Sequence, residues 1–278
     1  MPTKTSLSFR TNLARSATLA ILPSFLAACG SDAADTTTGK RIVLGTRVEG
    51  VGTQAAFTNA VGWTVTLTKA YVSTGAFYYF DGATIFSANV GPSRKEDLFD
   101  RLLGVRSAWA HPGHYVPGNA RGQMLTPTST DLAAGPASLA DGEGVTGIVR
   151  SATFSFATPA SGPVAAELGT HVAVLEGTAS NGTVDRPFRV EVDASEVLDS
   201  KGQPSIEGCP FTETEMKGDG TVTLKVSAPL WFDQADFSDT PVSSDGRRPL
   251  LTNDHAARRA LVRGMKAGDA YVFSYTAK

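Results

Sequence analysis

The stretch WTVTLTKAYVSTGAFYYF, residues 63–80, shows the fold class most directly. Trp63, Val65 and Leu67 alternate with threonines, and the run from Tyr71 to Phe80 is rich in aromatic residues. Successive side chains of a strand point to opposite faces, so a period of two predicts a half-buried strand. Aromatic and β-branched residues are also the ones that strands favour. We therefore predict strands over this stretch.

The same alternation recurs along the rest of the chain, and glycine-containing turn signals separate its occurrences. An Asp or Asn followed by Gly favours a tight hairpin turn, because both residues accept positive φ. The pattern predicts an all-β domain, an antiparallel β-sandwich or a related barrel, that begins near Arg41 and ends with a paired strand at Tyr271–Thr276. The apolar pairs are Phe154 and Phe156, Val172 and Val174, Val190 and Val192, Val222 and Leu224, and Tyr271 and Phe273; the turns are Asp81-Gly82, Asn181-Gly182 and Asp219-Gly220.

Helix signals are few, and they predict one or two short helices. Residues 93–96 have the spacing of a capping box before a leucine-rich stretch that ends at Gly104. Thr252 or Asn253 is expected to cap a second helix, with Ala257, Ala260 and Leu261 facing inward. No linker-like stretch interrupts the chain after residue 40, so we expect one domain over residues 41–278.

The first 28 residues have the composition of an export signal. Lys4, Arg10 and Arg15 are followed by a mostly apolar stretch from Ala17 to Ala28, without any acidic residue. This stretch is too short to cross a membrane, which takes about 20 apolar residues. It has the length of the apolar part of a signal peptide.

The stretch ends in Leu26-Ala27-Ala28-Cys29, which resembles the lipobox of bacterial lipoproteins. The resemblance implies a signal peptide over residues 1–28 and a lipid on the sulfur of Cys29, which would hold the protein at a membrane. Residues 29–40, small and polar, would form the tether. Gly30 stands where an aspartate marks retention in the inner membrane, so we expect the outer membrane, facing the periplasm; surface display and an unlipidated cysteine remain alternatives.

Charge and motifs exclude several function classes. Removing residues 1–28 removes three of the 25 basic residues against 27 acidic ones, which leaves a net charge of −5. With no basic stripe, nucleic acid is not an expected partner. The chain lacks the phosphate-binding loop, the dinucleotide fingerprint and the nucleophile elbow, so an enzyme is not the favoured interpretation. Paired carboxylates of a hydrolase or a carbohydrate-active protein stay open, since sequence alone does not pair them.

Cys29 and Cys209 are the two cysteines of the chain. If Cys29 carries a lipid, Cys209 has no partner within the chain for a disulfide. Cys209 is then a buried thiol, a metal ligand or a reactive free thiol. We expect the buried thiol, because free cysteine commonly behaves as a small core residue.

The segment WAHPGHYVPGNARGQM, residues 109–124, contains two of the four histidines, His111 and His114. Pro112 and Gly113 argue against a helix, but in a turn two imidazoles three residues apart can face one centre. Neutral imidazole suits copper and zinc, and thioether sulfur favours Cu(I). We predict a copper or zinc site here, with a third ligand from His171, Asp233 or Met124. Ordinary loop histidines, a strand-end His171 and a solvated Asp233 are the alternatives.

Three functions are therefore open. The preferred one is a non-catalytic, lipid-anchored protein that binds a metal; the others are a structural, adhesion or protein-interaction module, and a hydrolytic or carbohydrate-active protein. Segments such as Asp131-Leu132 and residues 145–150, VTGIVR, resemble uncharacterised bacterial lipoprotein domains. An exported sandwich with histidines is also similar to periplasmic copper-binding proteins. These resemblances carry no site residue over, and a shared fold does not establish a function.

Overall fold

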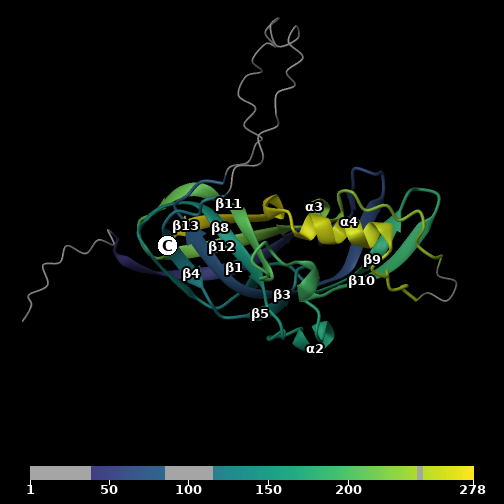
Figure 1. The fold of residues 1–278 in the computed structure, drawn as a ribbon, viewed down its shortest axis with the longest axis horizontal. Coiled ribbons are helices and arrows are strands. Elements are labelled where there is room, and N and C mark those ends of the chain that lie inside the picture. The colour runs from purple at the N-terminus through teal and green to yellow at the C-terminus, as the bar shows by residue number, and fades with distance from the viewer. Residues whose placement is uncertain (1–38, 85–114, 243–246) are drawn as a thin grey trace, which may run out of the picture. The chain divides into compact units, whose positions relative to one another are not determined.

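The structure is a computed structural model, and it describes residues 39–84, 115–242 and 247–278 (Figure 1). Most of its regular structure is β-strand. The strands are β1 Arg41–Val51, β2 Phe57–Thr58, β3 Thr64–Phe80, β4 Ala120–Met124, β5 Thr128–Asp131, β6 Ala137–Ser138, β7 Gly142–Val145, β8 Gly147–Phe156, β9 Ala173–Ser180, β10 Asp185–Val192, β11 Ser205–Met216, β12 Gly220–Ser227 and β13 Tyr271–Ala277.

Helices are short and few in the described residues, as expected from the sequence, although there are three α-helices rather than one or two. These are α2 Ala165–Leu168, α3 Ala228–Phe232 and α4 Ala256–Met265, with 3-10 turns η1 at Ala194–Glu196 and η2 at Gly268–Ala270. The helix expected near residue 93 lies outside the described residues.

All the strands belong to one sheet, and the sheet closes on itself. Its order is β10-β9-β3-β4-β7-β1-β12-β13-β11-β8, and β8 also pairs with β3. β3 allows this because it is 17 residues long. One of its edges pairs with β9 over residues 64–72 and then with β8 over residues 74–80. The strands from β3 to β8 thus form a closed ring, and β9 and β10 extend from it.

The sheet is mixed, whereas the sequence predicted an antiparallel one. β1 and β12 run parallel over eight residue pairs, from Leu44–Gly220 to Val51–Ser227. β11 and β13 are parallel at the single pair Phe211–Phe273. Hairpin signals predict only the pairing of neighbours in the chain, so they do not reveal contacts between strands far apart in sequence.

Two of the predicted turns show the difference between strands that pair with their neighbour in the chain and strands that do not. Asn181-Gly182 closes the predicted hairpin between β9 and β10, where Gly182 has a φ of 86°. Asp219-Gly220 connects β11 to β12, but β12 pairs with β1 and β13 instead. The last strand, β13, lies between β12 and β11, so the prediction that the chain end is paired inside the sheet is confirmed.

Aromatic side chains fill the inside of the ring. Phe154 stacks on Tyr271 with ring centroids 4.5 Å apart, and Phe77 lies 5.5 Å from Phe154. Each of these rings is fully buried. Burial of an aromatic side chain of this size is a major source of stability. The neighbours that complete this cluster are Tyr79, Phe156, Phe211 and Phe273.

The same apolar core continues between the β9–β10 hairpin and the helices. Phe188 of β10 contacts Phe232 of α3 with centroids 5.6 Å apart. Figure 1 shows α3 and α4 at this end of the molecule, near β9 and β10. Ala257 and Leu261 of α4 are buried, as predicted, but the helix is capped by His255, whose side chain accepts a hydrogen bond from the amide of Ala257.

Cys209 is a free, fully buried thiol on β11, which confirms the expected placement. Its sulfur lies 3.2 Å from the carbonyl oxygen of Ile206. Burial raises the pKa of the thiol to about 12, because the thiolate would be poorly solvated there.

Candidate functional site

The residues that carried the strongest predictions lie outside the described part of the chain. These are Cys29, the predicted lipid attachment site, and the histidine pair His111 and His114. The described chain resumes at Tyr115, directly after the pair.

The three candidates for a third metal ligand are described, and each has its own surroundings. Met124 of β4 is completely buried in the core. Asp233, which follows α3, accepts a hydrogen bond from the side-chain amide of Gln234 at 2.7 Å. His171 precedes β9 and contacts two carboxylates. Across residues 39–84, 115–242 and 247–278, no three His, Cys, Asp or Glu side chains are grouped as metal ligands.

Hydrogen bonds hold together the two ends of the segment that carries the histidine pair. The amide of Gly82 donates to the carbonyl of Pro117 at 2.8 Å, and Asp81 accepts from the amide of Asn119 at 2.7 Å. The Tyr115 hydroxyl lies 2.8 Å from the buried hydroxyl of Ser151. The residues that follow β3 and those that precede β4 are therefore held together by hydrogen bonds, and we call these two short segments the base.

Asp81 is the centre of this base. Its carboxylate also accepts two hydrogen bonds from Arg121, at 2.8 and 3.1 Å. Partial burial opposes the ionised form, but the donors of Asn119 and Arg121 outweigh it and hold the pKa of Asp81 below its usual value. The carboxylate is thus charged over the neutral range and keeps both segments in place.

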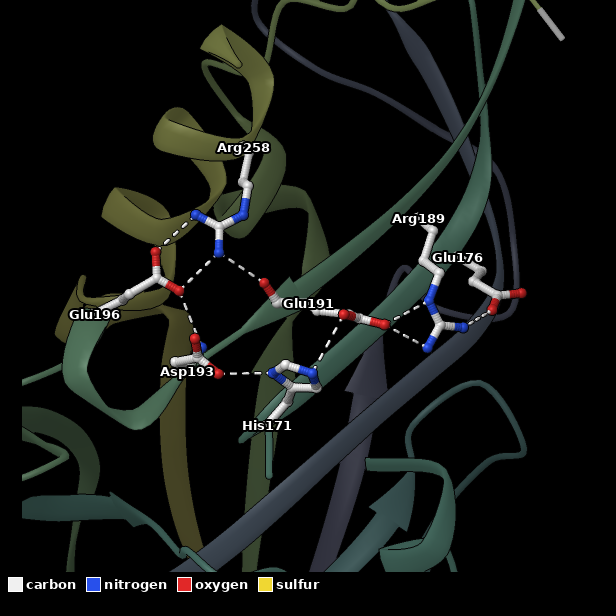
Figure 2. A network of polar contacts seen from close by, with 7 residues as sticks. All are labelled: His171, Glu176, Arg189, Glu191, Asp193, Glu196 and Arg258. Atoms are coloured by element: carbon white, nitrogen blue, oxygen red, sulfur yellow. Dashed lines mark hydrogen bonds and ion pairs between the residues drawn. The ribbon is translucent and has the colours of Figure 1, made fainter. Parts of the chain in front are cut away.

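The largest polar network of the described residues lies on β9, β10 and the segments beside them (Figure 2). Arg189 donates to Glu191 at 2.8 Å and also binds Glu176 of β9. Glu176 is nearly buried, and Lys69 of β3 and Arg248 lie 3.4 and 3.8 Å from it. Each carboxylate in this part of the network is matched by at least one cation.

His171 lies between two acids of the network. Its Nδ1 is 2.7 Å from Asp193, and its Nε2 is 3.2 Å from Glu191 (Figure 2). Both ring nitrogens are therefore occupied. To act as a metal ligand or a general base, the imidazole must first release one of these carboxylates.

Arg258 ties helix α4 to the same network. Its guanidinium donates to both carboxylate oxygens of Glu196, each at 2.7 Å, and to the carbonyl of Glu191 at 2.8 Å. Burial opposes the ionised form of Glu196, but the bonds from Arg258 and from the amide of Asp193 outweigh it and lower its pKa. The arrangement fits a structural joint between β10, η1 and α4.

The described residues also form a surface groove of about 650 Å³. It lies where β4 and β7 pair beside the start of β1, and we call it the β4–β7 groove. Its charged wall residues are Lys40, Arg41, Arg121, Glu143 and Asp219.

Of the polar network, sequence reasoning selected only His171, as a candidate metal ligand, and it did not select the groove. One signal for the network was available in RVEVD, residues 189–193, where charged residues alternate with buried valines. This alternation places Arg189, Glu191 and Asp193 on one face of β10. Arg258 gave no such signal, because one arginine among several on a predicted helix does not reveal which is buried.

Comparison with known proteins gives no relative: no family model, no curated protein and no solved structure matches the chain. A search of the described helices finds none that is long and apolar enough to cross a membrane.

Proposed function

We propose that this protein is a lipid-anchored, non-catalytic metal-binding lipoprotein of the bacterial cell envelope, in which His111 and His114 bind copper or zinc. The observation that carries the proposal is the set of hydrogen bonds between residues 81–82 and 117–119, which come before and after the segment 85–114 in the chain. Tyr115, the residue directly after His114, is held through Ser151. A fixed attachment point reduces the conformational entropy that a ligand must overcome on binding.

The polar network supports a non-catalytic function. A catalytic acid or base needs a free position next to the substrate. Both nitrogens of His171 face carboxylates instead, and Glu196 is held by Arg258. Met124 and His171 would each have to leave their present contacts to join a metal site, so we assign the site to the histidine pair, with Asp233 as the remaining candidate for a third ligand.

Metal binding is tested by calorimetry on protein purified without a histidine tag. We expect His111→Ala and His114→Ala each to abolish stoichiometric copper or zinc binding. Binding should also weaken below about pH 6, where imidazole is protonated. His255→Asn is the matched control, because asparagine keeps the helix cap and removes an imidazole elsewhere. If the unmutated protein binds copper and zinc more weakly than about 100 μM, or about −5.5 kcal/mol, a structural or protein-interaction module replaces the proposal.

The lipid anchor is tested separately by fractionation of cells. Cys29→Ser should leave the precursor unprocessed or release the protein from the membrane fraction. Cys209→Ser is the matched control, because it changes the other cysteine, which is buried in the domain. A Cys29→Ser protein that stays with the outer membrane like the unmutated one contradicts the anchor.

A further inference from the structure

The β4–β7 groove has the dimensions of a binding site for a small molecule. Its walls come from residues 40–43, 120–123 and 143–145 and from Asp219, which precedes β12. Its volume of about 650 Å³ lies within the range of roughly 300–1,000 Å³ that is common for such sites. The charges on its walls indicate which ligand chemistry it fits.

Three of the five charged wall residues already have partners in the protein. Arg121 binds Asp81 at 2.8 Å. Glu143 accepts a hydrogen bond from the side-chain amide of Gln123 at 2.9 Å, and Asp219 accepts one from the amide of Val43 at 2.8 Å. Arg121 is therefore neutralised by Asp81, whereas Glu143 and Asp219 keep their negative charge, because both of their donors are neutral groups.

Lys40 and Arg41 are different. Neither side chain has a hydrogen bond or an ion pair with any residue in the described ranges, and both are exposed. Their backbone is nevertheless fixed: Lys40 exchanges two hydrogen bonds of 2.9 Å with Thr146, and Arg41 pairs with Val145. The groove thus has two positioned cations that pair with no carboxylate in the described part of the chain.

Apolar side chains lie beside these cations. Arg41 and Val43 are two positions apart on β1 and share one face, about 7 Å apart. Val145 is directly opposite Arg41 on β7, so it shares that face as well. Val43 is 48% exposed, although it is paired with Glu143 of β7.

We propose that the β4–β7 groove binds an anionic amphiphile, with a carboxylate or phosphate group at Lys40 and Arg41 and an apolar part on Val43 and Val145. Guanidinium groups suit the oxygens of both anions, because their donors form a planar fork. Glu143 and Asp219 repel an anion from the rest of the groove, which directs the head group to the two cations. This site is independent of the histidine pair.

The experiment is calorimetry of the full chain with monomeric laurate and dodecyl phosphate. We expect Arg41→Gln to weaken binding about 10-fold, the loss of one hydrogen bond to a charged group. Val43→Asn should weaken it by a similar factor. Arg47→Gln is the matched control: Arg47 lies on the same strand and the same face, but it pairs with Glu49 at 3.3 Å and is not part of the groove.

Further ligands separate the contributions of the head group and the apolar part. Inorganic phosphate and neutral dodecyl maltoside should each bind at least 10-fold more weakly than dodecyl phosphate. Equal binding of the neutral detergent would overturn the role of the cations, and equal binding of inorganic phosphate would overturn the apolar part. The proposal is overturned if neither laurate nor dodecyl phosphate binds. It is also overturned if Arg41→Gln binds them as tightly as Arg47→Gln does. Retention on anionic vesicles without binding of either monomer assigns the cations to a membrane surface and overturns it as well.

Discussion

Replacing Arg258 with methionine is expected to lower the free energy of unfolding by about 3 kcal/mol. Arg258 is 5% exposed, although it lies on a helix at the surface of the domain. Its guanidinium donates three hydrogen bonds, two to the carboxylate of Glu196 and one to the carbonyl of Glu191. They connect α4 with β10 and η1, so their loss acts on three elements at once.

The magnitude follows from the exposure of the two partners. Removing one member of a buried ion pair costs about 3–5 kcal/mol, mainly because the remaining charge is left without a partner. The side chain of Glu196 is 21% exposed, so its carboxylate regains some water when Arg258 is removed. This places the loss near the lower end of the range. Methionine retains most of the apolar stem of arginine, so the change reports on the charge rather than on packing.

The assay is urea unfolding followed by circular dichroism. A loss of about 3 kcal/mol corresponds to a fall in Tm of about 6–12 °C for a domain of this size. Arg263→Met is the matched control, because Arg263 is exposed on the same helix, and its change should stay within about 0.5 kcal/mol. A loss below about 1 kcal/mol for Arg258→Met, with an unchanged slope in urea, would refute the reasoning.

Three more predictions follow from the described residues. Burial opposes ionisation of Glu196, but the hydrogen bonds from Arg258 and the Asp193 amide lower its pKa overall. The resulting stabilisation is present above the unfolded pKa of about 4.3 and is lost as the pH falls through the lower folded pKa. The difference in free energy of unfolding between the unmutated protein and Arg258→Met, measured in urea, should therefore shrink from pH 7 to pH 3. Phe154→Ala should lower the free energy of unfolding by about 3–5 kcal/mol in the same assay, because this fully buried ring contacts the three aromatic rings of Phe77, Phe156 and Tyr271. A loss near 1 kcal/mol would show that the interior of the closed sheet is loosely packed. Cys209 should not react with a thiol reagent at pH 8 in the native protein and should react fully in urea, since its buried thiol has a pKa of about 12; labelling of the native protein within minutes contradicts this placement.

The candidate sites depended on the sequence to different degrees. The composition of residues 1–28 and the histidine pair are local patterns, so both could be recognised from the sequence alone. Their roles remain predictions. The pairing of Arg258 with Glu196 could not be predicted from the sequence, because the two residues are 62 positions apart. The sequence also did not show that Lys40 and Arg41 pair with no acid among the described residues, because such pairing depends on the tertiary structure.

Local alternation in the sequence predicted the positions of several strands, though not of all. Alternation at Trp63–Phe80, Phe154–Phe156, Val222–Val226 and Tyr271–Tyr275 corresponds to β3, β8, β12 and β13, because side-chain direction along a strand is a local property of the backbone. Only the tertiary structure decided how these strands pair. The parallel contact of β1 with β12, the closure of β3 on β8 and the insertion of β13 between β12 and β11 join segments far apart in the chain. Such pairings are selected by burial of the common aromatic core, and no local pattern records them.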